Sequence, residues 1–293
     1  MNISIRRLYT DKFHDMLKKT GGYKTPEKGA RRPWPSWLAT IAFNLSMARI
    51  FIMGYIYAGR PNFMNEYWSE FGLMVYRLVE RLGGNIEIKG FDKLNEHKKP
   101  VVFVCNHVSS LETYLMPSIL MAWPGLIIIL KESLAHYPFF GRVVRSVDPI
   151  RVFRKNPLED LRTVLSEGTE GIKNGRSALI FPQGARYRVF DAKSFNTLGV
   201  KLAKKAGVDI GPIAVLTDFC RIGKKQRDLG MTVHPKSPVK IACGDIISNE
   251  LSPKEMNDKA IEFISNQLKE WESETGLTLL AKYHILHNLC IDC

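Results

Sequence analysis

From residue 86 onward, short apolar runs alternate with longer stretches of helical periodicity, and this alternation limits the folds open to the chain. Apolar residues recur every three or four positions over 112–122, 157–174 and 195–206, which predicts helices there. The apolar runs between them predict strands, and they read IEIKGF, PVVFVCN, GLIIIL, SALIFP and VDIGPIAVL. Alternating strands and helices form a sheet that is covered on both faces. We therefore predict an α/β fold, an αβ sandwich whose partly parallel sheet is flanked by helices.

The segments on either side of this region differ from it in composition. The N-terminal residues are polar and basic, which predicts a flexible arm and no signal peptide. Residues 36–59 are apolar, residues 63–82 have amphipathic helical spacing, and together they predict a helical hairpin. A polar amphipathic helix is predicted over 253–275. The expected organisation is a basic arm over 1–32, a membrane-associated hairpin over 33–85, a main domain over 86–250, and a C-terminal helix with an apolar tail over 251–293.

The apolar stretch 36–59 is long enough to cross a bilayer, since about 20 apolar residues are sufficient for a helix to do so. Arg49 near its centre disfavours a simple crossing, because a charged side chain is costly inside a bilayer. Aromatic residues typical of the membrane–water boundary stand near its two ends, namely Trp34, Trp37, Tyr55 and Tyr57. We predict a shallow or re-entrant membrane helix. A helix packed on the core of the domain is the alternative.

The formal net charge of +13 predicts a partner that carries negative charge. The sequence shows no zinc-finger spacing, RNP-like aromatic motif or homeodomain pattern, and its densest basic cluster lies beside the apolar hairpin. An anionic membrane surface is therefore favoured over nucleic acid. The five cysteines lie mostly in apolar segments, which is typical of a reduced protein of the cytosol, and the pair Cys290 and Cys293 is interpreted as part of the tail. We expect no metal and no cofactor.

One predicted strand ends on Asn106 and His107, and Glu112 follows His107 after four intervening residues. A carboxylate in the first turn of the next helix can hold one ring nitrogen of such a histidine. The other nitrogen is then available as a general base. A capping role for Ser109 or Ser110 would explain the same residues without any catalysis.

Four short blocks in this order resemble the family of 1-acylglycerol-3-phosphate acyltransferases and related glycerolipid acyltransferases, over roughly residues 86–245. The blocks read NHVSSLE, YPFFGRVVRSVDPIRVFRK, FPQGARY and VDIGPIAV. The resemblance implies an αβ sandwich preceded by a membrane-seated pair of helices. It implies transfer of a fatty acyl group from acyl-ACP or acyl-CoA to the free hydroxyl of a lysophospholipid, with lysophosphatidate as the expected acceptor. The implied location is the cytoplasmic face of the cell membrane.

On this resemblance, His107 is the general base and Glu112 holds its ring, while a nucleophilic Ser109 or Ser110 is disfavoured. Backbone N–H groups near 110–112 are candidates for stabilising the oxyanion. The substrate-binding positions implied are Arg154, Phe181, Pro182, Gln183, Gly184, Arg186 and Pro212, with Lys131, Arg151 and Arg188 as candidates of lower rank. The alternative for these arginines is that they only keep a basic surface hydrated.

The chain departs from the family pattern at several positions. Glu112 stands where aspartate is commoner, and Phe153 stands where the family often has an acid. Gln183 and Ala185 replace the usual glutamate and threonine. These changes keep the base and the arginines but alter the predicted acceptor pocket. Two alternatives therefore remain: an acyltransferase for another lysolipid or an amino-acid lipid, and a non-catalytic lipid-binding member of the same fold.

Overall fold

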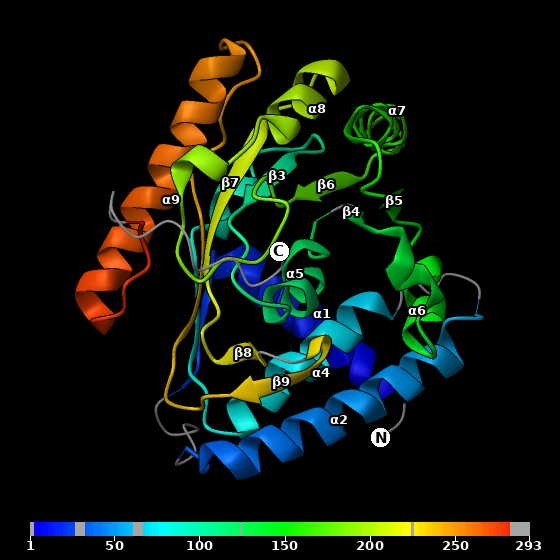
Figure 1. The fold of residues 1–293 in the computed structure, drawn as a ribbon, viewed down its shortest axis with the longest axis vertical. Helices are drawn as coiled ribbons and strands as arrows, with labels where there is room; N and C mark the ends of the chain where they lie inside the picture. Colours follow the sequence, from blue (N-terminus) through cyan, green and yellow to red (C-terminus); the bar gives the residue numbers. More distant parts are fainter. Residues whose placement is uncertain (1–2, 27–32, 61–66, 124, 224–225, 282–293) are drawn as a thin grey trace.

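The structure, a computed structural model, describes residues 3–26, 33–60, 67–123, 125–223 and 226–281 (Figure 1). Its centre is an eight-stranded sheet with the strand order β1-β2-β10-β7-β3-β6-β4-β5. The strands of this sheet are β1 (Tyr23–Lys24), β2 (Ile86–Lys89), β3 (Val102–Cys105), β4 (Leu126–Lys131), β5 (Ile150–Val152), β6 (Ser177–Ile180), β7 (Ile210–Leu216) and β10 (Val239–Cys243). A separate hairpin pairs β8 (Cys220–Gly223) with β9 (Gln226–Val233).

The sheet is mostly parallel. Strands β7, β3, β6, β4 and β5 run in one direction, while β10 pairs antiparallel with β7 and parallel with β2. The α-helices are α1 (Ile3–Thr20), α2 (Ser36–Tyr57), α4 (Trp68–Arg81), α5 (Leu111–Leu120), α6 (Phe140–Ser146), α7 (Pro157–Lys173), α8 (Leu198–Ala206) and α9 (Pro253–Thr275), and short 3₁₀ turns lie at Phe91–Leu94, Glu132–His136 and Ala192–Ser194. The predicted α/β sandwich is therefore confirmed.

Side chains of the central strand β3 alternate between two hydrophobic cores. Phe103 and Cys105 belong to the core beneath α1, α2, α4 and α5. Val102 and Val104 belong to the core beneath α7, α8 and α9. Because the strand is buried on both faces, its sequence is a continuous apolar run, and polar side chains appear only where it ends.

The predicted strands correspond to β2, β3, β4, β6 and β7, and the predicted helices to α5, α7, α8 and α9. Helix α9 begins at a capping box formed by Ser252 and Glu255 and ends at Gly276, whose φ of 69° is in the left-handed region. Sequence reasoning missed α6, β5, β8, β9 and β10. The strands β5 and β10 are short, so their pairing partners decide their conformation.

The predicted flexible arm over 1–32 is wrong over much of its length, because Ile3–Thr20 forms helix α1. Phe13 and Leu17, one helical turn apart, are buried against the domain. The ring of Phe13 packs edge-on against Tyr76 of α4, with 5.2 Å between centroids. Burial of this apolar stripe holds α1 in place although the sequence of the helix is largely polar. Residues 27–32 lie outside the described part of the chain.

Helices α2 and α4 lie side by side, as the predicted hairpin requires, but they have different environments. Helix α4 is largely buried between α1 and α5, and residues 61–66, including Phe63, lie outside the described residues. Helix α2 buries one face, through Phe43, Met47 and Ile50. Its other face is apolar and exposed, with Ile41, Leu45, Ile52 and Ile56 each at least half exposed.

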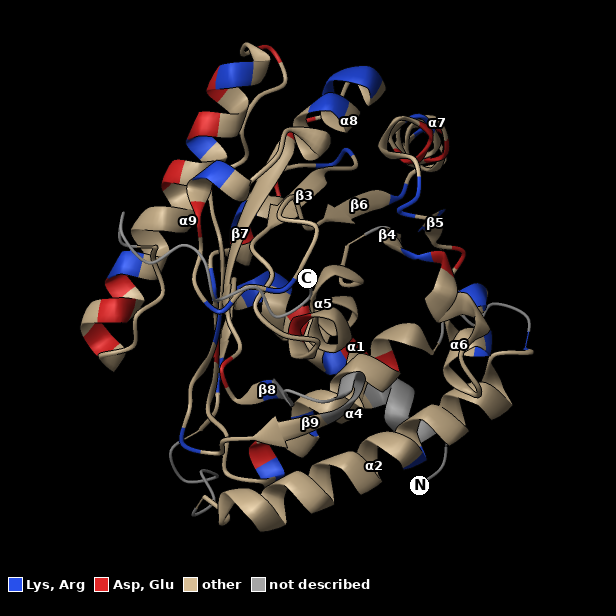
Figure 2. Cartoon of the chain, in the orientation of Figure 1, with Lys and Arg blue, Asp and Glu red and all other residues tan. Residues whose placement is uncertain are grey.

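Within the described residues, α2 is long and apolar enough to cross a membrane, as judged by length and composition. Figure 2 shows that α2 is almost free of charged residues, whereas α8 and α9 carry many. Only 28% of its most apolar window is buried, which is unlike a core helix. The helix packs on the domain, as the alternative interpretation expected, and leaves an apolar face open, while its place in a membrane stays a prediction. His284, His287, Cys290 and Cys293 lie in 282–293, outside the described residues.

Candidate active site

His107 lies at the carboxyl edge of the sheet, directly beyond the central strand β3. Its neighbouring strands β6 and β7 run parallel to β3, so their carboxyl ends reach the same edge. Residues 181–186 follow β6, and Thr217 follows β7. The polar segments that the sequence places far apart therefore converge here, as in other sheets of this type.

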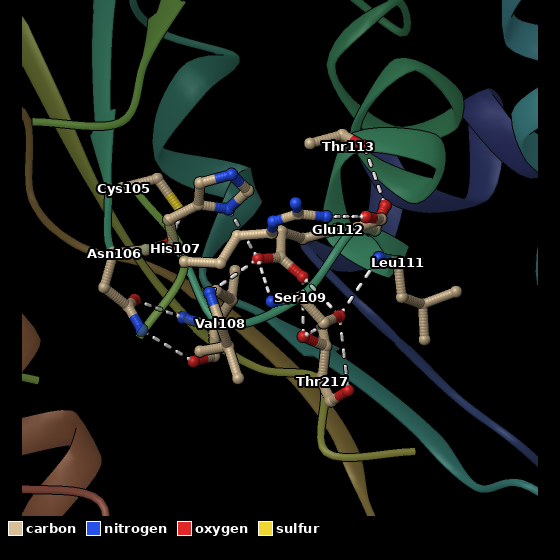
Figure 3. A network of polar contacts seen from close by, with 12 residues as sticks. Cys105, Asn106, His107, Val108, Ser109, Leu111, Glu112, Thr113 and Thr217 are labelled. Carbon is tan, nitrogen blue, oxygen red and sulfur yellow. Dashed lines mark hydrogen bonds and ion pairs between the residues drawn. The ribbon is translucent and has the colours of Figure 1, made fainter. Parts of the chain in front are cut away.

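The His107 ring and the Glu112 carboxylate form a close pair (Figure 3). The distance from His107 Nδ1 to Glu112 Oε1 is 2.8 Å, and Glu112 is completely buried. The backbone N–H groups of Val108 and Ser109 each donate to Glu112 Oε1 at 2.7 Å. The hydroxyls of Thr217 and Ser109 donate to Glu112 Oε2 at 2.6 and 2.9 Å. Every contact offers a hydrogen to an acceptor-only group, which suits an ionised carboxylate.

Burial by itself would raise the pKa of Glu112, but the hydrogen bond and charge of His107, together with Thr217 and Ser109, outweigh it and lower this pKa below its ordinary value of 4.5. A carboxyl group whose pKa falls on folding stabilises the protein above its unfolded-state pKa. That contribution is lost as the pH falls through the folded-state pKa.

We therefore expect the stability difference between wild type and Glu112→Gln to be constant near neutral pH and to shrink below about pH 4.5. Urea unfolding of both proteins at a series of pH values measures this difference. A difference that stays unchanged well below that pH would show that Glu112 is not an ionised carboxylate in the folded protein.

Three contacts hold His107 in place besides the carboxylate. Its ring stacks on Phe181, with 4.2 Å between centroids and 23° between planes. Gln183 Oε1 accepts a hydrogen bond from the His107 backbone N–H at 3.0 Å, and the Tyr187 N–H donates to the His107 carbonyl at 2.8 Å. Because Nδ1 faces Glu112, Nε2 is the nitrogen available to a substrate, and His107 lines a pocket of about 380 Å³.

Arg154 lines the same pocket, and its backbone is unusual. Its φ of 57° is in the left-handed region, which non-glycine residues seldom adopt. The Asp160 carboxylate, in the first turn of α7, accepts the N–H groups of Phe153 and Arg154 at 2.8 Å each. These two bonds hold the loop so that Arg154 and His107 border one cavity. Gly184, which also lines it, has a φ of 70° in the turn after Gln183.

The remaining predicted site residues lie at different distances from this cavity. Arg186 donates to the Ser110 hydroxyl, beside the dyad. Arg151 is exposed and 3.4 Å from Glu132, while Lys131 is exposed at the end of β4. Pro182 is buried next to Gln183, and Pro212 is buried within β7 and is not among the residues that line the His107 pocket. The substrate-binding roles of all of these stay predictions.

Sequence reasoning missed Thr217 and Asp160, which the fold brings to the site. Thr217 is the first residue after the predicted strand VDIGPIAVL, so the rule that ligands gather at strand ends would have indicated it. Among the N–H groups near 110–112 that were expected to stabilise an oxyanion, that of Leu111 donates to Ser109 Oγ at 3.0 Å. The preceding N–H groups of Val108 and Ser109 bind Glu112.

A second pocket, of about 180 Å³, adjoins the first and is almost entirely apolar. It lies between α2, α4, α5, α6 and β4. Ile129, Leu130 and Phe181 line both pockets, so the two cavities meet close to the His107 ring. Phe51, Phe71, Pro117, Val143 and Leu179 are among its other lining residues.

Comparison with known proteins finds relatives that cover most of the chain. Residues 85–216 match the family model described as "Acyltransferase". The 1-acyl-sn-glycerol-3-phosphate acyltransferase of Pseudomonas aeruginosa is 28% identical over 219 residues, which span 75% of this chain and 79% of that protein. The protein of the same name from Cocos nucifera is 27% identical over 69% of this chain and 63% of its own length. That of Saccharomyces cerevisiae is 28% identical over 47% of this chain and 45% of its own length.

A solved structure has a similar fold. The 1-acyl-sn-glycerophosphate (LPA) acyltransferase PlsC from Thermotoga maritima superposes with a TM-score of 0.58 at 18% identity, over 93% of this chain and 98% of that one. The likeness in fold extends beyond the residues that the family model matches. Residues 85–216 therefore match the acyltransferase family, and the chain is similar to enzymes named 1-acyl-sn-glycerol-3-phosphate acyltransferase.

Proposed function

We propose that this enzyme transfers a fatty acyl group from an acyl thioester, acyl-ACP or acyl-CoA, to the free hydroxyl of lysophosphatidate, giving phosphatidate. The observation that carries the proposal is the His107–Glu112 pair at 2.8 Å, with the ring at the border of a pocket that also contains Arg154. A histidine held through Nδ1 by a buried carboxylate is poised to take a proton at Nε2.

The reaction then needs one base and no covalent enzyme intermediate. His107 Nε2 takes the proton of the acceptor hydroxyl while the hydroxyl oxygen forms a bond to the thioester carbonyl carbon. When the tetrahedral intermediate breaks down, the carbon–sulfur bond is cleaved, and the departing sulfur takes the proton from the imidazolium. Glu112 stabilises that imidazolium while it exists. Ser109 is a poor nucleophile in this site, because its hydroxyl donates to Glu112 and it is 1% exposed.

Arg154 supplies the positive charge for the acceptor phosphate in this proposal, since guanidinium groups match phosphate oxygens in geometry. Arg186, which contacts Ser110 beside the dyad, is the second candidate. Gln183 is neutral and uses its carbonyl oxygen to bind the His107 N–H. Compared with the family's usual glutamate, Gln183 leaves the acceptor side without a negative charge. The contact with the His107 backbone N–H is kept.

The apolar pocket is the proposed site of the fatty acyl chain. It meets the His107 pocket at Phe181, so a thioester carbonyl near the ring can extend its hydrocarbon chain between α2 and α5. The pocket is lined mostly by apolar side chains, and burying each methylene there stabilises the complex by about 0.8 kcal/mol.

Val143→Phe is expected to shift the enzyme toward shorter acyl chains. Val143 lines this pocket, and a Cβ added at Gly54 of α2 would lie 3.0 Å from it, so a larger side chain has room only on the pocket side. The kcat/KM for long-chain donors should fall roughly tenfold or more relative to short-chain donors. Competition between donors of different length measures this ratio. Val143→Ala, the matched control, should shift this ratio toward long-chain donors. An equal loss of kcat/KM for donors of all lengths would show that the fatty acyl chain binds elsewhere.

We further propose that the apolar face of α2 rests on the cytoplasmic surface of the cell membrane. In this proposal, 33–85 is the membrane-associated unit, through α2, ahead of a catalytic unit over 86–250. Exposed apolar side chains on α2 and a net charge of +13 both favour an anionic lipid surface.

The direct test incubates the purified full chain with labelled acyl-CoA or acyl-ACP and a panel of lysolipids in mixed vesicles. We expect lysophosphatidate to be the preferred acceptor. Preference for an acceptor without a phosphomonoester would assign another lysolipid or an amino-acid lipid. Binding of lipid with no acyl transfer to any acceptor would contradict the proposed catalysis.

A further inference from the structure

A second cationic site lies beside the dyad, outside the residues that line the Arg154 pocket. Arg188 is the second residue after Arg186, and Tyr187 between them contacts the His107 carbonyl. Asp218 directly follows Thr217, which contacts Glu112. Arg188 and Asp218 each directly follow a residue that contacts the dyad. Since consecutive Cα atoms are about 3.8 Å apart, their backbones lie close to it.

Asp218 holds two arginines. Its side chain is 5% exposed, and its Oδ1 accepts Arg188 Nη2 at 3.0 Å and Arg221 Nε at 2.9 Å. The other oxygen, Oδ2, accepts Arg221 Nη2 and the Ser237 hydroxyl, the latter at 3.2 Å. Arg221 therefore binds the carboxylate through two nitrogens, a geometry that fixes the plane of its guanidinium group.

The charges of this group do not cancel. One carboxylate faces two guanidinium groups, so one positive charge is left over. The nearby His234 adds no compensating negative charge, and its pKa is lowered by burial and by the positive charge of Arg221. The side chains of Arg188 and Arg221 are 45% and 31% exposed, which leaves guanidinium N–H donors for a ligand from solvent. A single arginine would have been enough to neutralise Asp218.

We propose that Arg188 and Arg221, oriented by Asp218, form a phosphate-binding clamp that holds a phosphoryl group of one substrate while its reacting end lies at His107. The proposal rests on the acyl transfer proposed above and adds a binding site to it. The shared chemistry is a phosphoryl oxygen, which fits an immobilised guanidinium pair. Two sources are available: the phosphomonoester of the lysolipid acceptor and the phosphates of the pantetheine-carrying donor.

The test compares wild type with Arg221→Gln in four substrate combinations. The donor is acyl-CoA or an acyl-N-acetylcysteamine thioester, which has no phosphate. The acceptor is lysophosphatidate or monoacylglycerol, which has no phosphate either. Loss of one charge-assisted contact should lower kcat/KM roughly tenfold to a hundredfold where the phosphate in question is present.

The pattern identifies the source. A loss confined to lysophosphatidate, with either donor, assigns the clamp to the acceptor. A loss confined to acyl-CoA, with either acceptor, assigns it to the donor. Equal losses in all four combinations, or no loss in any, would overturn the proposal.

Two further variants separate binding from folding. Arg188→Gln leaves the two-nitrogen contact between Arg221 and Asp218 in place, and it should reproduce the same pattern with an unchanged Tm. Lys236→Ala removes one positive charge from the exposed turn before Ser237 without touching Asp218, and it should behave like wild type.

A binding measurement that needs no turnover keeps this proposal distinct from the catalytic one. Calorimetry with coenzyme A and with glycerol 3-phosphate as probes should show weaker binding of one probe to Arg221→Gln and unchanged binding to His107→Ala. That result supports the clamp even if acyl transfer fails. Wild-type protein that binds neither probe, or variants that bind both as wild type does, would contradict it.

Discussion

His107→Ala is expected to lower acyl transfer by at least about a hundredfold while leaving the fold and membrane binding unchanged, because it removes the proposed base. The ring contributes a stacking contact with Phe181 and a bond to Glu112, but it is not part of either hydrophobic core. The measurement is kcat/KM with saturating lipid, together with Tm and vesicle sedimentation. Retention of more than about a tenth of wild-type activity would exclude general-base catalysis by His107.

Glu112→Gln is the matched companion variant. An amide can still orient the ring through its oxygen but cannot stabilise the imidazolium, so activity should be severely reduced and yet detectable. Its amide nitrogen would also face donors among the four groups that now bind the carboxylate. Activity equal to that of wild type would show that the charge of Glu112 has no part in the reaction.

Charging the exposed face of α2 is expected to release the protein from vesicles. Ile41, Leu45 and Ile52 are 51%, 68% and 50% exposed, and we would replace all three with glutamate. Burying a side chain of this size fully is worth about 1.5–3 kcal/mol, and about 1.4 kcal/mol is tenfold in an equilibrium constant. The triple variant should therefore partition onto vesicles at least about a hundredfold more weakly and use lipid acceptors poorly.

The matched control changes net charge by the same amount elsewhere. Lys254, Lys259 and Lys269 are exposed on α9, and their replacement by glutamine likewise lowers the net charge by three. This control should bind vesicles somewhat more weakly than wild type at low salt and equally at high salt, because it leaves the apolar face intact and salt screens the charge difference. If the two triple variants lose binding equally, charge alone attaches the protein, and the apolar face of α2 does not enter the membrane.

The expected membrane role of α2 shows how far composition reaches. Its length, apolar content and aromatic ends are properties of one continuous segment, so they were evident without a structure. Which of its faces is buried depends on Phe43 and Met47 meeting the rest of the domain. The same applies to α1, where polar composition predicted a flexible arm and tertiary burial of Phe13 and Leu17 formed a packed helix.

Local sequence patterns were sufficient to predict the central strands, most of the helices and the pairing of His107 with Glu112. Strands buried on both faces are continuous apolar runs, and residues five apart at a strand–helix junction meet through local chain geometry. The tertiary structure alone decided that Thr217 completes the shell of Glu112, that Asp160 shapes the Arg154 loop, and that Asp218 gathers Arg188 and Arg221. The contacts of Thr217 and Arg188 join residues 105 and 30 positions apart. The contacts of Asp160 and Arg221 depend on the conformation of irregular loops. Such contacts depend on strand order and loop conformation, which no local periodicity encodes.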